Sequence, residues 1–76
     1  MNNKRRAYLK AAVDMIRKSK NIVEYAQEEE QDALDNLPEN LEDSERYSKM
    51  ENAADSLSDA CDALDEAIGL IEDAVA

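Results

Sequence analysis

A seven-residue repeat of apolar side chains in the last third of the chain limits the possible folds to helical ones. One position of the repeat holds a large apolar residue in every heptad, and the position three residues later holds alanine: Met50, Leu57, Leu64 and Ile71, then Ala53, Ala60, Ala67 and Ala74. A sustained seven-residue repeat predicts a left-handed supercoiled seam, and the alanines allow two helix backbones to approach closely. The repeat therefore predicts close antiparallel packing of two helices.

The first half of the chain has a matching helical pattern. Asn2 or Asn3 can cap a helix there. Apolar residues then recur at spacings of three and four: Tyr8, Leu9, Ala12, Met15, Ile16, Ile22, Val23 and Ala26. Pro38 cannot continue this helix and disfavours helical geometry at Leu37, so the helix ends near Asp35 or Asn36.

The second helix has competing start signals. Asp43 or Ser44 can serve as N-cap, and Ser48 with Glu51 matches the capping-box spacing. We favour Ser44, which predicts one helix over about 3–36 and another over about 44–75. The segment between them is a short connector that holds at most one helical turn, begun by Pro38.

The 76 residues form one small domain, and the short connector makes the helices an antiparallel hairpin. Their apolar stripes are wider than one partner helix can cover, so we expect a homodimer, a four-helix bundle with an alanine-rich seam. A monomer that awaits a helix from another protein is the alternative. The predicted oligomer seam consists of Leu9, Ile16, Val23, Met50, Leu57, Leu64 and Ile71.

Charge is distributed very unevenly along the chain. Residues 1–27 have a net charge of +5 and residues 44–76 a net charge of −7, so antiparallel folding places opposite charges side by side. We expect ion pairs between the first helix, through Lys4, Arg5, Arg6 and Lys10, and the end of the second, through Asp65, Glu66, Glu72 and Asp73. The connector region 28–43 contributes −8 with no basic residue.

The composition argues against catalysis and cofactors. The chain has no histidine and one cysteine, which removes zinc, haem and the usual Ser-His and Cys-His mechanisms, and the connector lacks the pattern of an EF-hand calcium loop. We predict that the protein is not an enzyme and binds no cofactor, with Cys61 serving in packing. No apolar run approaches the roughly 20 residues that span a bilayer, so the prediction is a cytoplasmic protein without membrane contact.

The acidic run is the candidate partner-binding site, because it can attract a basic protein while the net charge of −10 repels nucleic acid. Direct nucleic-acid binding by the basic start is therefore not expected. The predicted partner-binding residues are Glu28, Glu29, Glu30, Asp32, Asp35, Glu39, Glu42 and Asp43.

The stretch EEEQDALDNLPENLEDSERYSKME, followed by acidic heptads, resembles a family of small acidic helical proteins of phages and prophages. The resemblance covers about residues 24–76. It implies a protein of a mobile element, acting in the host cytoplasm. The predicted function is an interaction module that binds and inhibits a basic, nucleic-acid-binding host or anti-phage defence protein by nucleic-acid mimicry. The alternative is a non-catalytic homo-oligomer that scaffolds an assembly.

Overall fold

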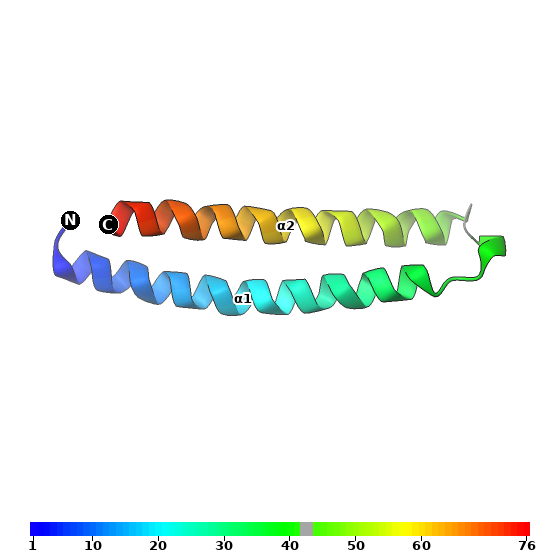
Figure 1. Cartoon of the computed structure of the whole chain (residues 1–76), viewed down its shortest axis with the longest axis horizontal. Coiled ribbons are helices and arrows are strands. Elements are labelled where there is room, and N and C mark those ends of the chain that lie inside the picture. Colours follow the sequence, from blue (N-terminus) through cyan, green and yellow to red (C-terminus); the bar gives the residue numbers. More distant parts are fainter. Residues whose placement is uncertain (42–43) are drawn as a thin grey trace.

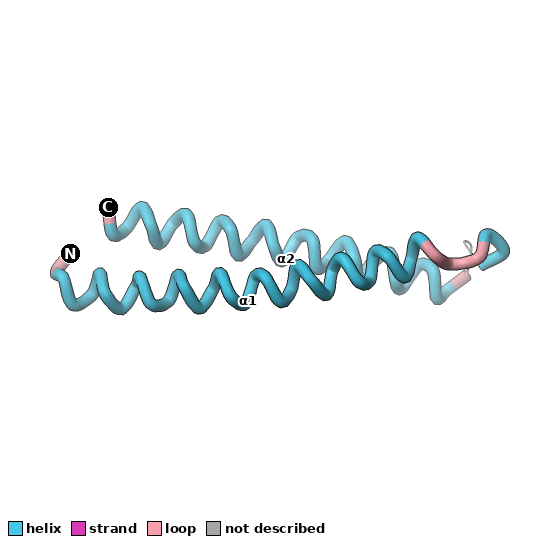
Figure 2. Tube along the Cα trace, turned by 60° about the horizontal axis from the view of Figure 1, so that its bottom comes forward, coloured by secondary structure: helices cyan, strands magenta, loops and turns pink. Residues whose placement is uncertain are grey.

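Two long helices make up most of the chain (Figure 1). The computed structural model describes residues 1–41 and 44–76, in which helix α1 spans Asn3–Asp35, a 3-10 turn η1 spans Glu39–Leu41 and helix α2 spans Glu45–Val75. No strand occurs in these residues. The helices run antiparallel and side by side, with both termini at one end (Figures 1 and 2). The predicted helical hairpin is confirmed.

Both helices begin at the predicted capping residues. The Asn2 side-chain oxygen accepts a hydrogen bond from the Arg5 backbone N–H at 2.8 Å. The Ser44 hydroxyl oxygen accepts one from the Tyr47 backbone N–H at 3.1 Å. Each bond satisfies a backbone donor that has no partner within its own helix.

The end of α1 and the connector also follow the sequence. Asn36 closes α1 by donating a side-chain hydrogen bond to the Asp32 carbonyl at 2.7 Å. Pro38 then starts the short turn η1, where its carbonyl accepts a hydrogen bond from the Leu41 backbone N–H at 2.9 Å. The predicted helical turn after Pro38 is confirmed.

The two helices meet along a seam of alternating three- and four-residue steps. Val13 and Leu34 on α1 and Ala54 and Ile68 on α2 are the buried residues, each less than 9% exposed. Around them lie other seam residues, all of them half-buried: Leu9, Ile16, Lys20, Val23, Gln27 and Glu30 of α1, and Met50, Leu57, Cys61, Leu64, Ile71 and Val75 of α2. This spacing is typical of a left-handed coiled coil. All seven predicted seam residues lie here, between helices of one chain.

The alanine series takes a different place from the one expected. Ala53, Ala60 and Ala67 are half-buried beside the seam, and Ala74 is exposed. Within the seam, the neighbouring position is filled instead by Ala54, Cys61, Ile68 and Val75. The alanine series therefore borders a face of the hairpin that α1 does not cover.

The molecule is a thin rod. Its principal extents are 59 × 15 × 13 Å, and its radius of gyration is 17.3 Å, against about 11 Å for a compact domain of this length. Its accessible surface of 5690 Å² also exceeds the roughly 4,700 Å² expected for a compact monomer of this mass. A single hairpin therefore leaves about 1,000 Å² more surface in water than a compact fold of the same mass.

Candidate interaction surfaces

The acidic run lies at the end of the rod that holds the connector, which we call the tip; the other end is the open end. Glu30 is half-buried, and the remaining described members of the run are exposed: Glu28, Glu29, Asp32 and Asp35 of α1 and Glu39 of η1. Glu42 and Asp43 lie outside the described residues. Because consecutive helical residues point in different directions, these carboxylates surround the end of α1 and do not form one flat patch.

Glu29 and Glu30 interrupt two different apolar rows. Glu30 occupies a seam position, and its carboxylate makes no hydrogen bond or ion pair with the rest of the described chain. Glu29 ends the exposed row that begins at Tyr8. A hydrogen bond from Tyr25 to the Glu29 carboxylate, together with the charge of that carboxylate, raises the pKa of Tyr25 above its usual value. The tip half still holds two of the four buried seam residues, Leu34 and Ala54, so these two acids do not open the seam there.

The whole net charge of the molecule belongs to one half of the rod. Residues 24–55, which we call the tip half, contain twelve carboxylates and two basic residues, for a net charge of −10. Residues 1–23 and 56–76, the open half, contain seven of each and have no net charge. The field of the rod is therefore strongly one-sided, negative around the tip.

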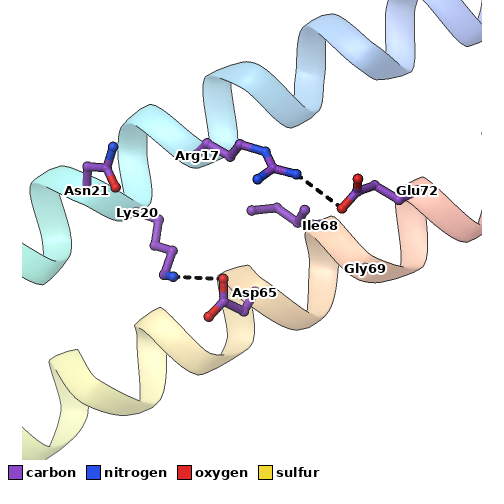
Figure 3. A pocket seen from close by; sticks show the side chains of 7 residues that line it. All are labelled: Arg17, Lys20, Asn21, Asp65, Ile68, Gly69 and Glu72. Atoms are coloured by element: carbon purple, nitrogen blue, oxygen red, sulfur yellow. Dashed lines mark hydrogen bonds and ion pairs between the residues drawn. The ribbon is translucent and has the colours of Figure 1, made fainter.

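The open half is neutral partly because α1 and α2 form ion pairs across a shallow groove (Figure 3). Arg17 contacts Glu72 at 3.2 Å, and Lys20 contacts Asp65 at 2.8 Å. Gly69 lies between the two acids and leaves open space where a side chain would stand. We call this side of the hairpin the polar face. Its cations already have anionic partners, so the groove offers no free charge to an anion.

The cations at the start of α1 do not form the ion pairs expected of them. α1 begins beyond the end of α2 (Figure 1). The register of Lys20 with Asp65 brings Leu9 level with Ala76, so Lys4, Arg5 and Arg6 lie past the last residue of α2. Lys4 instead lies 5.9 Å from the centre of the Tyr8 ring, and Arg6 donates to the Asn3 side chain at 3.2 Å. The prediction for Lys4, Arg5, Arg6 and Lys10 is therefore wrong for the described residues.

Lys20 is a charged residue in the apolar seam. Its side chain is 24% exposed, and its ammonium group reaches Asp65 and, at 4.0 Å, Glu24. The hydrogen bond to Asp65 raises the pKa of Lys20 above its usual value, against the opposing effect of burial. A charged residue at a seam position costs stability and fixes the register of two helices. We therefore interpret Lys20 as the residue that holds α1 and α2 in alignment.

Replacing Lys20 by leucine should stabilise the hairpin. Lys20→Leu fills a seam position with an apolar side chain and loses only a partly exposed ion pair, so we expect a gain on the order of 1 kcal/mol, or several degrees in melting temperature. Thermal unfolding followed by circular dichroism measures this. Lys18→Leu, at an exposed position two residues earlier, should change the melting temperature little. A lower melting temperature for Lys20→Leu would show that the ion pair outweighs the seam contact.

The side opposite the groove is uncharged over most of its length. The ion pairs place one flank of each helix on the polar face, so the other flanks must meet on the opposite side. We call this side the apolar face. It comprises Tyr8, Ala12, Met15, Ser19, Ile22 and Ala26 of α1, and Ala53, Ser56, Ala60, Ala63, Ala67, Leu70 and Ala74 of α2. Its large members are among the most exposed apolar residues: Tyr8 62%, Met15 68%, Ile22 71% and Leu70 63%.

No protein-family model, curated protein or solved structure matches the chain. The described residues contain no group of three or more carboxylate or thiol side chains placed to hold a metal ion. Within the same ranges, neither helix combines the length and the apolar character needed to cross a bilayer. On the charge and exposure described above, the candidate sites are two surfaces of the rod: the acidic tip and the apolar face.

Some features of these surfaces could not be predicted from periodicity alone. Lys20 and Gln27 lie in the seam although both are polar, and Val13 is buried there although the apolar stripe could be drawn without it. Leu70 is exposed although it adjoins the seam residue Ile71. Assigning these positions needs the rotation of each helix about its axis, which the two ion pairs on the polar face supply.

Proposed function

We propose that the protein is a non-catalytic interaction module whose tip binds a basic surface of another protein. The observation that supports this is the confinement of the net charge of −10 to the tip half. That half contains twelve carboxylates and only two basic residues. A one-sided negative field steers a basic partner onto the tip and accelerates their encounter. Nucleic-acid-binding proteins carry basic surfaces of this kind, because they neutralise phosphates.

The proposed target is a nucleic-acid-binding host or anti-phage defence protein, which the tip blocks by occupying its phosphate-binding surface. In this proposal the protein is encoded by a mobile element and acts in the host cytoplasm. The carboxylates surround the end of α1, so they present negative charge in several directions, as a nucleic-acid backbone does. That arrangement supports mimicry of charge distribution and does not require a shaped pocket.

The test is capture of the target from a host lysate on the immobilised protein, with elution in a salt gradient. We expect a basic protein to elute at moderate salt, its Kd rising about tenfold or more between 50 and 200 mM salt, because exposed charges are screened over roughly 10 Å at 0.1 M. A DNA duplex should displace the same target. Binding that is insensitive to both salt and duplex DNA would contradict the proposal.

A second proposed role is structural: two copies associate into a four-helix bundle that scaffolds an assembly. The observation that favours it is the apolar face, whose four large side chains are each more than 60% exposed in a single hairpin. Apolar side chains in a row on one face typically mark an interaction surface. The two roles are compatible, because the tip and the apolar face are different surfaces.

A further inference from the structure

The apolar row of α1 is complementary to itself when read backwards. Extended by one step at each end, it runs in alternating steps of three and four residues through Arg5, Tyr8, Ala12, Met15, Ser19, Ile22, Ala26 and Glu29. Laid antiparallel on a second copy, the row places Arg5 opposite Glu29, with each large apolar residue opposite a small one: Tyr8 with Ala26, Met15 with Ser19, and Ile22 with Ala12.

We propose that the occupant of the apolar face is a second copy of this chain, bound with its tip pointing the opposite way. The inference rests on the homodimer proposed above and specifies its surface, orientation and register. In a two-fold symmetric interface, each contact between two different residues occurs twice, so the Arg5–Glu29 pair and the three large–small pairs all form twice. Side chains that alternate in size can interdigitate at the density of a protein core.

The residues that α2 contributes to the apolar face fit the same arrangement. The register of Lys20 with Asp65 places the centre of the α1 row, near Arg17, level with residues close to Ala67 of α2. When two α2 helices lie antiparallel and centred at that level, Ala67 lies near Ala67 of the second copy. Leu70 then lies near Ala63 of the second copy. Small residues at these positions allow two α2 helices to pack at short distance.

The exposed area of the single hairpin matches the size of such an interface. Its surface exceeds that of a compact monomer by about 1,000 Å², and a typical specific interface buries about 800 Å² on each partner. The apolar face has no charged residue from Tyr8 to Ala26 on α1 or from Ala53 to Ala74 on α2. An uncharged face of the same length complements this one, and a second copy of the chain provides it.

Charge decides the orientation. With both tips at one end, two halves of net charge −10 would lie side by side. With the tips at opposite ends, each tip half adjoins a neutral open half of its partner. Within α1, residues 1–23 have a net charge of +6 and residues 24–35 a net charge of −6, so antiparallel α1 helices place opposite charges together along the interface. Like-charge juxtaposition disfavours the other orientation.

The proposed dimer has a four-helix centre and two projecting acidic ends. The self-complementary row of α1 ends at Glu29, so the last turns of α1, the connector and the start of α2 extend beyond the centre on each side. Glu29 is then used in the interface, and the exposed carboxylates beyond it, Asp32, Asp35 and Glu39, stay free to bind partners. This arrangement makes the dimer bivalent, with one acidic tip at each end.

Two neighbouring substitutions test whether the apolar face is the interface. Ile22 and Asn21 are both exposed, but Asn21 lines the groove on the polar face. We expect Ile22→Glu to raise the dimer dissociation constant at least about a hundredfold in analytical ultracentrifugation, because a charge would be buried without a partner. Asn21→Glu should leave it within about threefold. A monomeric unmodified chain, or equal effects of both changes, would overturn the proposed interface.

A charge exchange tests the orientation separately. Arg5→Glu and Glu29→Arg should each raise the dissociation constant about tenfold, and the double exchange should restore it to within about threefold. A spin label on Glu39→Cys, in a Cys61→Ser chain, gives an independent measurement on an exposed residue far from the interface. The 18 helical residues after Arg17, up to Asp35, at 1.5 Å each on both sides of the centre, place the ends of the two α1 helices about 54 Å apart, so we expect the labels just beyond them to be more than about 50 Å apart.

The outcomes test the orientation of the dimer and its register separately. A label separation under about 30 Å would mean that the tips lie together, and would overturn the orientation while leaving the dimer in place. Failure of the double exchange to restore affinity would overturn the register. Neither result bears on partner binding by the tip, which the salt-gradient capture tests in its own right.

Discussion

Ala54→Glu is expected to abolish the folded hairpin. Ala54 is 1% exposed, the most buried of the core residues. Continuing the register of Lys20–Asp65 ten residues toward the tip brings Glu30 level with Ala54 and Asp55. A glutamate at position 54 would therefore combine a buried charge, a larger side chain and a nearby carboxylate. Each of these mechanisms alone is destabilising, and together they cost several kcal/mol.

That cost compares with the whole stability of the chain, since small domains are stable by roughly 0.05–0.15 kcal/mol per residue. Circular dichroism at 25 °C should show loss of most helical signal. The matched control is Asn52→Glu, an exposed site two residues earlier. It should change the free energy of unfolding by less than about 0.5 kcal/mol and leave the midpoint nearly unchanged. Retained helicity and an unchanged midpoint for Ala54→Glu would place the seam elsewhere on α2.

Neutralising the tip is expected to weaken partner binding while stabilising the chain. The change combines Glu28→Gln, Asp32→Asn and Asp35→Asn, three exposed positions that avoid both the seam and the apolar face. Removing three of the charges that steer the partner should lower affinity about tenfold, or about 1.4 kcal/mol. The three acids lie in the C-terminal turns of α1, where negative charge opposes the helix dipole, so the melting temperature should stay constant or rise.

The control removes the same number of charges from the open half. Asp59→Asn, Asp62→Asn and Glu66→Gln change exposed residues of α2 that make no ion pair with the described chain. Both triple variants have a net charge of −7, so any difference in affinity for the captured target comes from the location of the charge. Equal losses would show that the target responds to total charge and not to the tip.

Local signals in the sequence predicted the helices closely. Asn2, Ser44 and Pro38 act through bonds and steric limits that involve only near neighbours, and each has the predicted role. The helix bounds therefore agree to within one residue. The heptad row from Met50 to Ile71 also predicted which side of α2 faces its partner.

The relation between the helices was harder to predict. The expected ion pairs assumed that the two helices end level with each other, but α1 overhangs α2 at the open end. The offset depends on the length of the connector and on the ion pair between Lys20 and Asp65. A periodic pattern of apolar residues encodes neither. Which residues form the apolar face depends on the rotation of each helix about its axis, which the two ion pairs of the polar face indicate.

The location of both chain ends at the open end has a practical consequence for every binding measurement (Figure 1). A biotin or affinity tag on either terminus attaches the rod to a support by the half that carries no net charge. The tip then points into solution, up to about the 59 Å length of the rod away from the surface. At 0.15 M salt that distance is many times the roughly 8 Å Debye length, so charges on a sensor chip would not disturb what the tip captures.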